Sequence, residues 1–510
     1  MLKKIQPSTV NLDIPASEQD DNVWSDVNNM YFKAFGSVRA EGWGNIFNPA
    51  VITDPYHLQY HRQSGLHYWV YAGDQTIGVT DLVTHWDITP PLMSPTEPER
   101  FVGGNLNSIT LLTNSYDPPW YWQGDPLVNF AELPNWPADT RCKWIRPFRY
   151  NAIAGNITEN GINYENQLYW SASVTPGNPP DDWQPLPTND AGDNILASTQ
   201  GEIVDGMQLR DFFIIAKRQS MYVMRYIGGL FIFDFTELTS SIGVLAPNCM
   251  VGFEGRLFVF GDGDIVVTDG SQIQSIADLR VRRTIFDEMN QDIIERCFVV
   301  AYGAKRQIWF CYPSGGNTVA NKAAIYSMTD DSWGFRDLPQ TYHAAQGVAY
   351  NYRAAGSWED DLQPWDLDNS IWDSAGNIDL ADNIVMTSTD EFGRLYGVDF
   401  TGNKNGQPMT GKLAKNSMDF GDALQYKIIR RVWPYVVGQE GMEITIRIGT
   451  QGLDADPVTW TPPQKYIFGE TDYINVLAKG RLISLEIVGE PVSAWRVYSV
   501  SFEYDVVSRF

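Results

Sequence analysis

Short apolar runs separated by tight turns constrain the fold of this chain more than any other feature of its sequence. The clearest example is residues 257–270, where two β-prone runs flank the Gly-Asp-Gly-Asp segment at 261–264. Glycine and aspartate tolerate the positive φ angles that tight hairpin turns require, so this segment predicts one antiparallel hairpin. Asp262 and Asp264 could also ligate calcium, but a hairpin turn accounts for both without a ligand.

The same pattern of apolar run, polar turn and apolar run recurs along the chain. Further candidates are residues 68–80, 212–226 and 308–328. Short strands with turn residues between them indicate an all-β chain. Hairpins at intervals of a few tens of residues favour the blades of a β-propeller over the closer spacing of a single sandwich. Residues 280–290 are the best candidate for a short helix, because apolar residues recur there at a spacing of four.

The pattern divides the chain into three parts. Residues 1–60 are polar and turn-rich, with too few apolar residues for a core of their own, so we expect an N-terminal arm over a neighbouring surface or another subunit. Residues 61–410 hold the predicted β-propeller. Residues 411–510 contain strictly alternating apolar and polar positions, which predict a small C-terminal β-sandwich with solvent-exposed outer faces.

Residues 353–383 interrupt the propeller pattern with an acidic insertion rich in Trp-Asp sequences. Its tryptophans fall seven residues apart, at Trp358, Trp365 and Trp372. Acidic residues follow each of them, namely Glu359, Asp360, Asp361, Asp366, Asp368 and Asp373. A spacing of seven also suits a coiled coil, but Pro364 and Gly376 exclude one. Two interpretations remain, an ordered acidic loop anchored by the tryptophans and a flexible insertion.

The charge of the chain limits its partners. Thirty-seven Lys and Arg residues against 62 Asp and Glu residues give a formal net charge of −25. Such a surface repels phosphates and anionic lipids, which argues against a protein that grips DNA. A wall that conducts DNA should not bind its cargo, so the charge is compatible with that role as well as with simple solubility.

The sequence offers little for metal or cofactor chemistry. His57, His61 and His67 could bring three imidazoles to one metal on a helix, but Pro55 and Gly65 argue against a helix there. The cysteines share no Cys-x-x-Cys spacing, which predicts buried free thiols in a protein folded in a reducing cytoplasm. We therefore predict no metal site and no cofactor.

Catalytic and membrane signals are also missing from the sequence. It contains no Gly-x-Ser-x-Gly, Walker or His-Glu-x-x-His motif, and we predict that the protein is not an enzyme. No run approaches 18 apolar residues and no apolar segment follows the first lysines, so we expect neither a membrane-spanning segment nor a signal peptide.

Several segments together resemble a known family. They are residues 144–155, 168–171, 204–215, 221–229, 308–313, 324–326 and 332–333. Their order and spacing are similar to those of the tail hub or nozzle proteins of short-tailed bacteriophages, a group that includes the packaged-DNA stabilisation and tail tubular proteins. The resemblance covers about residues 60–400, and the Trp-Asp repeats also look like those of phage virion proteins.

The resemblance implies a structural virion protein of the phage tail, assembled in the cytoplasm of the host bacterium. It implies a β-propeller subunit in a homohexamer, a ring that docks beneath the head-to-tail adaptor and carries tail fibre, tailspike or needle proteins. Such a ring retains packaged double-stranded DNA and then conducts it without sequence-specific binding. The acidic insertion at 353–383 would be a lumen or tip element.

Two other functions stay open at this stage. A propeller that binds or degrades host surface glycans would suit the abundant tryptophans. A monomeric scaffold propeller is the third possibility, and it predicts a single chain in solution.

Overall fold

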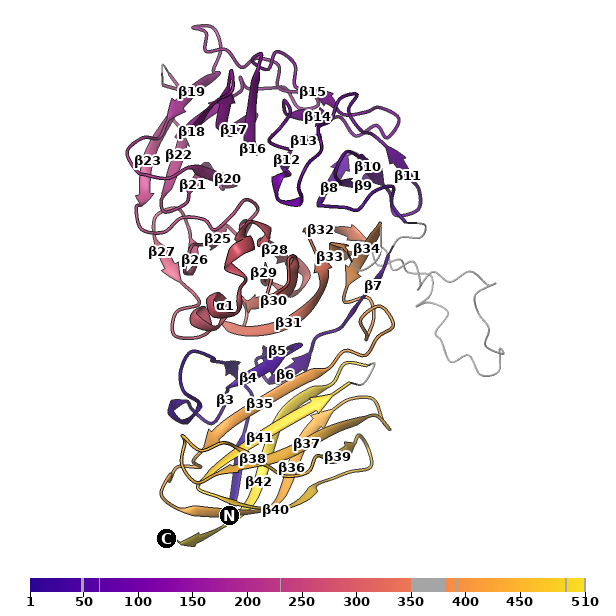
Figure 1. The fold of residues 1–510 in the computed structure, drawn as a ribbon, viewed down its shortest axis with the longest axis vertical. Helices are drawn as coiled ribbons and strands as arrows, with labels where there is room; N and C mark the ends of the chain where they lie inside the picture. The colour runs from indigo at the N-terminus through magenta and orange to yellow at the C-terminus, as the bar shows by residue number, and fades with distance from the viewer. Residues whose placement is uncertain are drawn as a thin grey trace, which may run out of the picture.

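Seven antiparallel units of four strands form a ring in the part of the chain that the structure describes (Figure 1). Six of them are separate four-stranded sheets, and the sixth in ring order is one end of a ten-stranded sheet. This structure is a computed structural model that describes residues 1–46, 50–63, 65–229, 231–349, 381–389, 393–490 and 493–508. The first sheet holds β8 (His57–Gln63), β9 (Leu66–Ala72), β10 (Ile77–Thr80) and β11 (His85–Asp87). The second holds β12 (Val102–Leu106), β13 (Ile109–Thr113), β14 (Trp120–Trp122) and β15 (Ala131–Glu132).

The middle of the chain supplies the next three sheets. The third holds β16 (Thr140–Phe148), β17 (Asn151–Glu159), β18 (Ile162–Trp170) and β19 (Gly192–Ile195). The fourth holds β20 (Ile203–Leu209), β21 (Phe212–Lys217), β22 (Met221–Tyr226) and β23 (Phe233–Thr239). The fifth holds β24 (Met250–Phe253), β25 (Arg256–Phe260), β26 (Ile265–Thr268) and β27 (Ile273–Ser275).

The last two sheets close the ring. The sixth holds β28 (Phe298–Tyr302), β29 (Gln307–Tyr312), β30 (Ala320–Ser327) and β31 (Ser332–Thr341). The seventh holds β32 (Ala344–Ala349), β33 (Ala381–Ser388), β34 (Arg394–Val398) and, from the N-terminal region, β7 (Trp43–Asn45). The first strand of each sheet contacts the first strand of the next, and β32 contacts β8. The predicted all-β fold is therefore confirmed, and the sheets have the arrangement that a propeller requires.

The hairpins predicted from the sequence are present in the ring. Strands β25 and β26 pair from Phe260 to Ile265 across the Gly-Asp-Gly-Asp turn, where Gly263 has a φ of +85°. The hairpins β9–β10, β21–β22 and β29–β30 correspond to the other three predicted segments. Their strands are apolar on both faces, because neighbouring sheets cover each side, and β13, β26 and β28 are buried at every residue.

Helices are few and short within the described residues. The predicted helix at 280–290 is α1 (Arg282–Glu288), which buries Ile285. The four 3₁₀ segments are η1 (Ala16–Glu18), η2 (Pro98–Arg100), η3 (Gln291–Arg296) and η4 (Gly303–Lys305). Across the described ranges, none of the helices has the length and apolar character needed to cross a bilayer.

A separate six-stranded sheet and the other end of the ten-stranded sheet form a C-terminal unit below the ring in Figure 1. One holds β38 (Thr459–Trp460), β37 (Glu443–Gln451), β41 (Leu482–Gly489), β35 (Gly411–Met418), β4 (Asp26–Asn28) and β39 (Gln464–Ile467). The other holds β6 (Gly36–Arg39), β42 (Arg496–Ser508), β36 (Tyr426–Val437), β40 (Ile474–Gly480) and β1 (Leu2–Ile5). Buried side chains of both sheets, such as Ile446, Leu485 and Phe502, belong to one apolar cluster.

The N-terminal arm expected over residues 1–60 is not confirmed, because the strands of this region are incorporated into sheets formed by later parts of the chain. Strands β1 and β4 pair with β42 and β35 of the C-terminal unit, whereas β7 completes the seventh sheet of the ring. The remaining N-terminal strands are β2 (Thr9–Val10), β3 (Val23–Trp24) and β5 (Met30–Lys33). The few apolar side chains of this region cannot build a core alone, but they complete cores that other segments begin.

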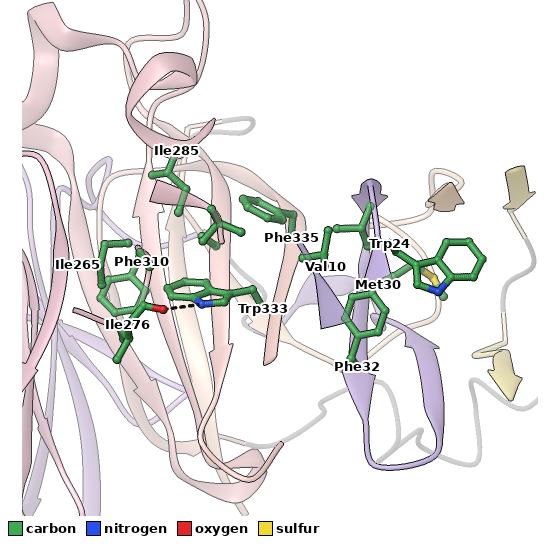
Figure 2. Close-up of a cluster of buried hydrophobic side chains, with 14 of the residues drawn as sticks. Val10, Trp24, Met30, Phe32, Ile265, Ile276, Ile285, Phe310, Trp333 and Phe335 are labelled. Atoms are coloured by element: carbon green, nitrogen blue, oxygen red, sulfur yellow. Dashed lines mark hydrogen bonds between the residues drawn. The ribbon is translucent and has the colours of Figure 1, made fainter. Parts of the chain in front are cut away.

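One buried cluster joins the ring to the C-terminal unit (Figure 2). Figure 2 shows Val10, Trp24, Met30 and Phe32 of the N-terminal strands beside Phe335 of the ring, and apolar residues of the C-terminal unit belong to the same cluster. On the ring side, the indole Nε1 of Trp333 donates a hydrogen bond to the carbonyl of Ile276 at 3.1 Å. Burial of this many large apolar side chains is the main force that holds the two parts together.

The backbone connects the two parts as well. The sixth sheet of the ring continues from β31 to β5, then through the β5–β6 hairpin to β42. A single ten-stranded sheet therefore runs from the ring into the C-terminal unit.

Candidate functional site at the centre of the ring

A cavity of about 420 Å³ lies where the first strands of the seven sheets converge. Each of β8, β12, β16, β20, β24, β28 and β32 contributes at least one lining residue. The polar lining residues include His57, Gln59, Asn105, Arg146, Asn248 and His343. The site is thus built by ring closure, since these residues are far apart in the sequence.

Arg146 is the charged centre of this cavity. Its guanidinium forms a bidentate pair with Asp205 of β20, with Nε–Oδ1 at 2.9 Å and Nη2–Oδ2 at 2.7 Å. It also donates to Asn248 Oδ1 at 2.8 Å and to the carbonyl of Gly103. Asp205 is fully buried and accepts a further hydrogen bond from the backbone N–H of Asn248. The charge of Arg146 is compensated, so the group joins three sheets rather than offering a free cation to a ligand.

Two histidines stack beside this pair. The rings of His57 and His343 lie 4.4 Å apart, centroid to centroid, at an interplanar angle of 30°. Burial, with a smaller contribution from Arg146, lowers the pKa of His343 to about 4. Burial lowers the pKa of His57 well below its ordinary value, and His343 and Arg146 add to the effect. Both imidazoles are therefore neutral at pH 7.

The lining limits the chemistry of the cavity. Its described lining residues include no carboxylate, serine or cysteine. Glycoside hydrolysis needs two carboxylates flanking the scissile bond, and acyl transfer needs an activated nucleophile. The arrangement instead provides neutral hydrogen-bonding groups around a compensated ion pair, which suits structural closure or the binding of a neutral polar molecule.

The three histidines considered as metal ligands do not come together. They lie on strands β8 and β9 rather than on a helix. His61 Nδ1 is 2.8 Å from Thr110 Oγ1, and His67 Nδ1 contacts the hydroxyl of Tyr60, while His57 stacks on His343. Within the described part of the chain, no group of three or more His, Cys, Asp or Glu side chains is placed to hold a metal ion.

Residues 353–380 of the predicted acidic insertion fall outside the described residues, and residues 381–383 form the start of β33. The carboxylates predicted for a lumen or tip are Glu359, Asp360, Asp361, Asp366, Asp368 and Asp373, and the predicted anchors are Trp358, Trp365 and Trp372. Their role stays a prediction.

The four cysteines, by contrast, are free and buried as expected, and burial raises the pKa of the Cys142 thiol to about 12.

Sequence reasoning missed an exposed aromatic surface on the C-terminal unit. Trp433 and Tyr435 of β36 are 37% and 61% exposed, although their neighbours Val432 and Val436 are buried. Trp433 lies 4.7 Å from Tyr473, and Tyr435 lies 5.2 Å from Tyr498, between ring centroids. The signal in the sequence was the run Val-Trp-Pro-Tyr-Val-Val at 432–437, in which apolar residues occupy both faces of one strand.

No protein-family model matches this chain, and no curated protein matches it. Among solved structures, the extracellular domain of a one-component system from B. thetaiotaomicron is 13% identical, with a TM-score of 0.32, and the match covers 61% of this chain and 39% of that one. A fungal alcohol oxidase in complex with copper is 8% identical, with a TM-score of 0.44 and coverage of 92% and 100%. The Pan2 WD40 domain of Neurospora crassa is 9% identical, with a TM-score of 0.33 and coverage of 72% and 95%. Similarity at this level carries no argument about activity, substrate or partner.

Proposed function

We propose that the chain is a seven-bladed β-propeller with a C-terminal β-sandwich, and that it serves as a structural subunit of a bacteriophage tail nozzle. In this role six copies form a ring beneath the head-to-tail adaptor, and the ring retains packaged DNA and then conducts it. Tail fibre, tailspike or needle proteins would attach to the same ring.

The observation that carries this proposal is the single sheet that runs from the ring of sheets into the C-terminal unit. A sheet shared through β31, β5, β6 and β42 makes the two parts one rigid block, reinforced by the buried cluster around Trp24 and Trp333. Rigid blocks of this kind suit the wall of a channel under mechanical load.

The charge supports the same role. A net charge of −25 on each chain makes an assembly of copies strongly negative. DNA that moves past such a wall is repelled rather than captured, so it can pass without stopping at preferred sequences. A protein that binds DNA tightly would instead have an excess of basic residues on its DNA-binding surface.

Native mass measurement tests the proposal directly. A tail nozzle should give a species near six times 57.6 kDa and ring-shaped particles in electron micrographs. The same chain should be found by mass spectrometry in purified virions. A protein that stays at 57.6 kDa at all concentrations, and is missing from virions, would contradict the proposal.

A second candidate is a propeller tail protein that binds or degrades host glycans. The exposed aromatic rings of Trp433, Tyr435 and Tyr473 favour it, because sugars stack on such rings. Release of reducing sugar from host polysaccharide, or retention of the protein on that polysaccharide, would support this candidate instead.

A further inference from the structure

The outer surface of the sheet β40–β36–β42 combines aromatic and cationic side chains. We call it the aromatic face and define it by Trp433, Tyr435, Tyr473, Leu477 and Tyr498. Leu477 is 80% exposed, which is unusual for leucine in a sheet. Exposed apolar groups gathered on one face mark interaction surfaces, and Trp, Tyr and Arg are the residues enriched at protein interfaces.

Two of the cations on this face pair with carboxylates, and two lie over aromatic rings. Arg430 pairs with Asp505, and Arg431 pairs with Glu503 at 3.5 Å. Within the described part of the chain, Lys479 and Arg496 have no carboxylate within 4 Å. Their charged groups lie over the rings of Tyr426 and Tyr498, each 5.3 Å from the ring centroid. The face therefore carries two cations that remain available to an acidic partner.

The aromatic face has an excess of positive charges, whereas the molecule as a whole is negatively charged. Arg430, Arg431, Lys479 and Arg496 lie on this sheet, and the carboxylates Asp505 and Glu503 pair with the first two of these cations. The whole chain has 37 cations against 62 carboxylates, so the molecule as a whole is acidic. A second copy of the chain offers complementary charge, whereas a nucleic acid would be repelled by the rest of the molecule.

We propose that the aromatic face is the surface by which one copy binds an acidic surface of the next copy. A two-fold contact of the face with itself would bring together two surfaces on which cations outnumber carboxylates. The contact is therefore heterologous, with different surfaces on the two copies, and heterologous contacts close into rings when the rotation permits. This inference rests on the proposed ring and names the surface that builds it.

Paired substitutions test the face while leaving the fold intact. Trp433→Ala with Tyr435→Ala should raise the protein concentration needed for ring formation roughly tenfold or more. Tyr150→Ala with Tyr164→Ala is the matched control, since both tyrosines are exposed on the third sheet of the ring and its loops. Native mass spectrometry measures the ring fraction, and circular dichroism with thermal melting should show that both double variants fold like the unmodified chain.

Charge reversal tests the complementarity. Lys479→Glu with Arg496→Glu should abolish the ring at concentrations where the control Arg283→Glu with Lys465→Glu retains it. Arg283 and Lys465 are exposed cations away from the face, with side chains 79% and 67% exposed. In mixtures of isotopically light and heavy copies, zero-length carbodiimide coupling should join Lys479 of one copy to a carboxylate of the other.

The outcomes separate this inference from the proposed function. If the unmodified chain forms rings and both pairs of face variants form them equally well, the aromatic face is not the contact, although the nozzle role stands. If the variants of the aromatic face still form rings but are no longer retained on host polysaccharide, the inference is likewise overturned, and the face is assigned to glycan binding. If the unmodified chain is a monomer in solution and in virions, both proposals fail.

Discussion

At the scale of single residues, the buried charged side chains differ in whether a counter-charge offsets the cost of removing them from water. Asp205 and Arg146 are both buried and satisfy each other through two hydrogen bonds. Lys415 is equally buried, but its ammonium has only the carbonyl of Ala16 and the side-chain oxygen of Gln19 nearby, both at 3.4 Å. The two sites should respond to substitution in opposite directions.

We expect Asp205→Asn to destabilise the protein by about 3–5 kcal/mol, because it leaves the Arg146 guanidinium buried without a counter-charge. Chemical denaturation followed by tryptophan fluorescence measures the loss. Asp211→Asn, at an exposed position two residues beyond β20, is the control and should change stability by less than about 0.5 kcal/mol. Equal effects at both positions would contradict the importance of the pair.

We expect Lys415→Met to stabilise the protein at pH 7 by about 1–3 kcal/mol. Burial lowers the pKa of Lys415 to about 8, while Asp21 and Asp20 oppose the shift. Between pH 8 and the ordinary lysine pKa, the unfolded chain binds a proton that the folded chain has released. The stability of the wild-type protein therefore rises with pH in this window, and the advantage of the methionine variant should shrink. A Lys465→Met control should show neither effect.

Acid should destabilise the fold through the central histidines. The pKa of His343 is about 4 in the folded protein, so from pH 6.5 down to pH 4 the unfolded chain binds the proton first. Stability is then present above pH 6.5 and is lost as the pH falls toward 4. Thermal melting across this range should show a smaller decline for His343→Gln than for the wild type, and an equal decline in the two proteins would contradict this role of His343.

At the scale of elements, closure of the ring depends on β7, a strand of three residues. It pairs with β34 from Tyr396↔Asn45 to Val398↔Trp43. Gly42, which directly precedes β7, packs closely against the backbone of another segment. A Cβ atom at Gly42 would lie 1.7 Å from the carbonyl oxygen of Asn403. The last sheet is thus completed by a segment that lies some 350 residues away in the chain, which is a long-range pairing of high entropic cost.

We expect Gly42→Ala to displace β7 and loosen the seventh sheet, since the new methyl group would meet backbone atoms that cannot easily move. Hydrogen exchange should accelerate in β7 and β34, and the melting temperature should fall by several degrees. Gly316→Ala is the matched control, because a Cβ atom there would meet nothing within 4 Å. Unchanged exchange in β34 would show that β7 does not hold the ring closed.

At the scale of the whole molecule, the shared sheet and the shared cluster should make the ring and the C-terminal unit unfold together. Calorimetry should show one cooperative transition. Trp24→Ala, at the buried junction, should lower the temperature of that entire transition, with a cost of about 3–5 kcal/mol. Two separate endotherms in the wild type would contradict the single-block description.

Much of the fold could be read from local patterns, and the rest could not. The hairpin around Gly263, the helix at Ile285 and the buried free cysteines follow from turn chemistry, spacing and composition, which are local properties. The destinations of β1, β4 and β7 were not predictable, because a short strand with few apolar residues carries no record of which edge it will pair with.

The candidate sites divide in the same way. The sequence by itself determined that the chain is all-β, strongly acidic and built from repeated hairpins, because these depend on residue type and short-range order. Only the tertiary structure decided that Arg146 meets Asp205, that His57 stacks on His343 and that Trp433 faces solvent. Those outcomes depend on ring closure and on which face of a strand another sheet covers, and the free energy of both is set by contacts between segments far apart in the chain.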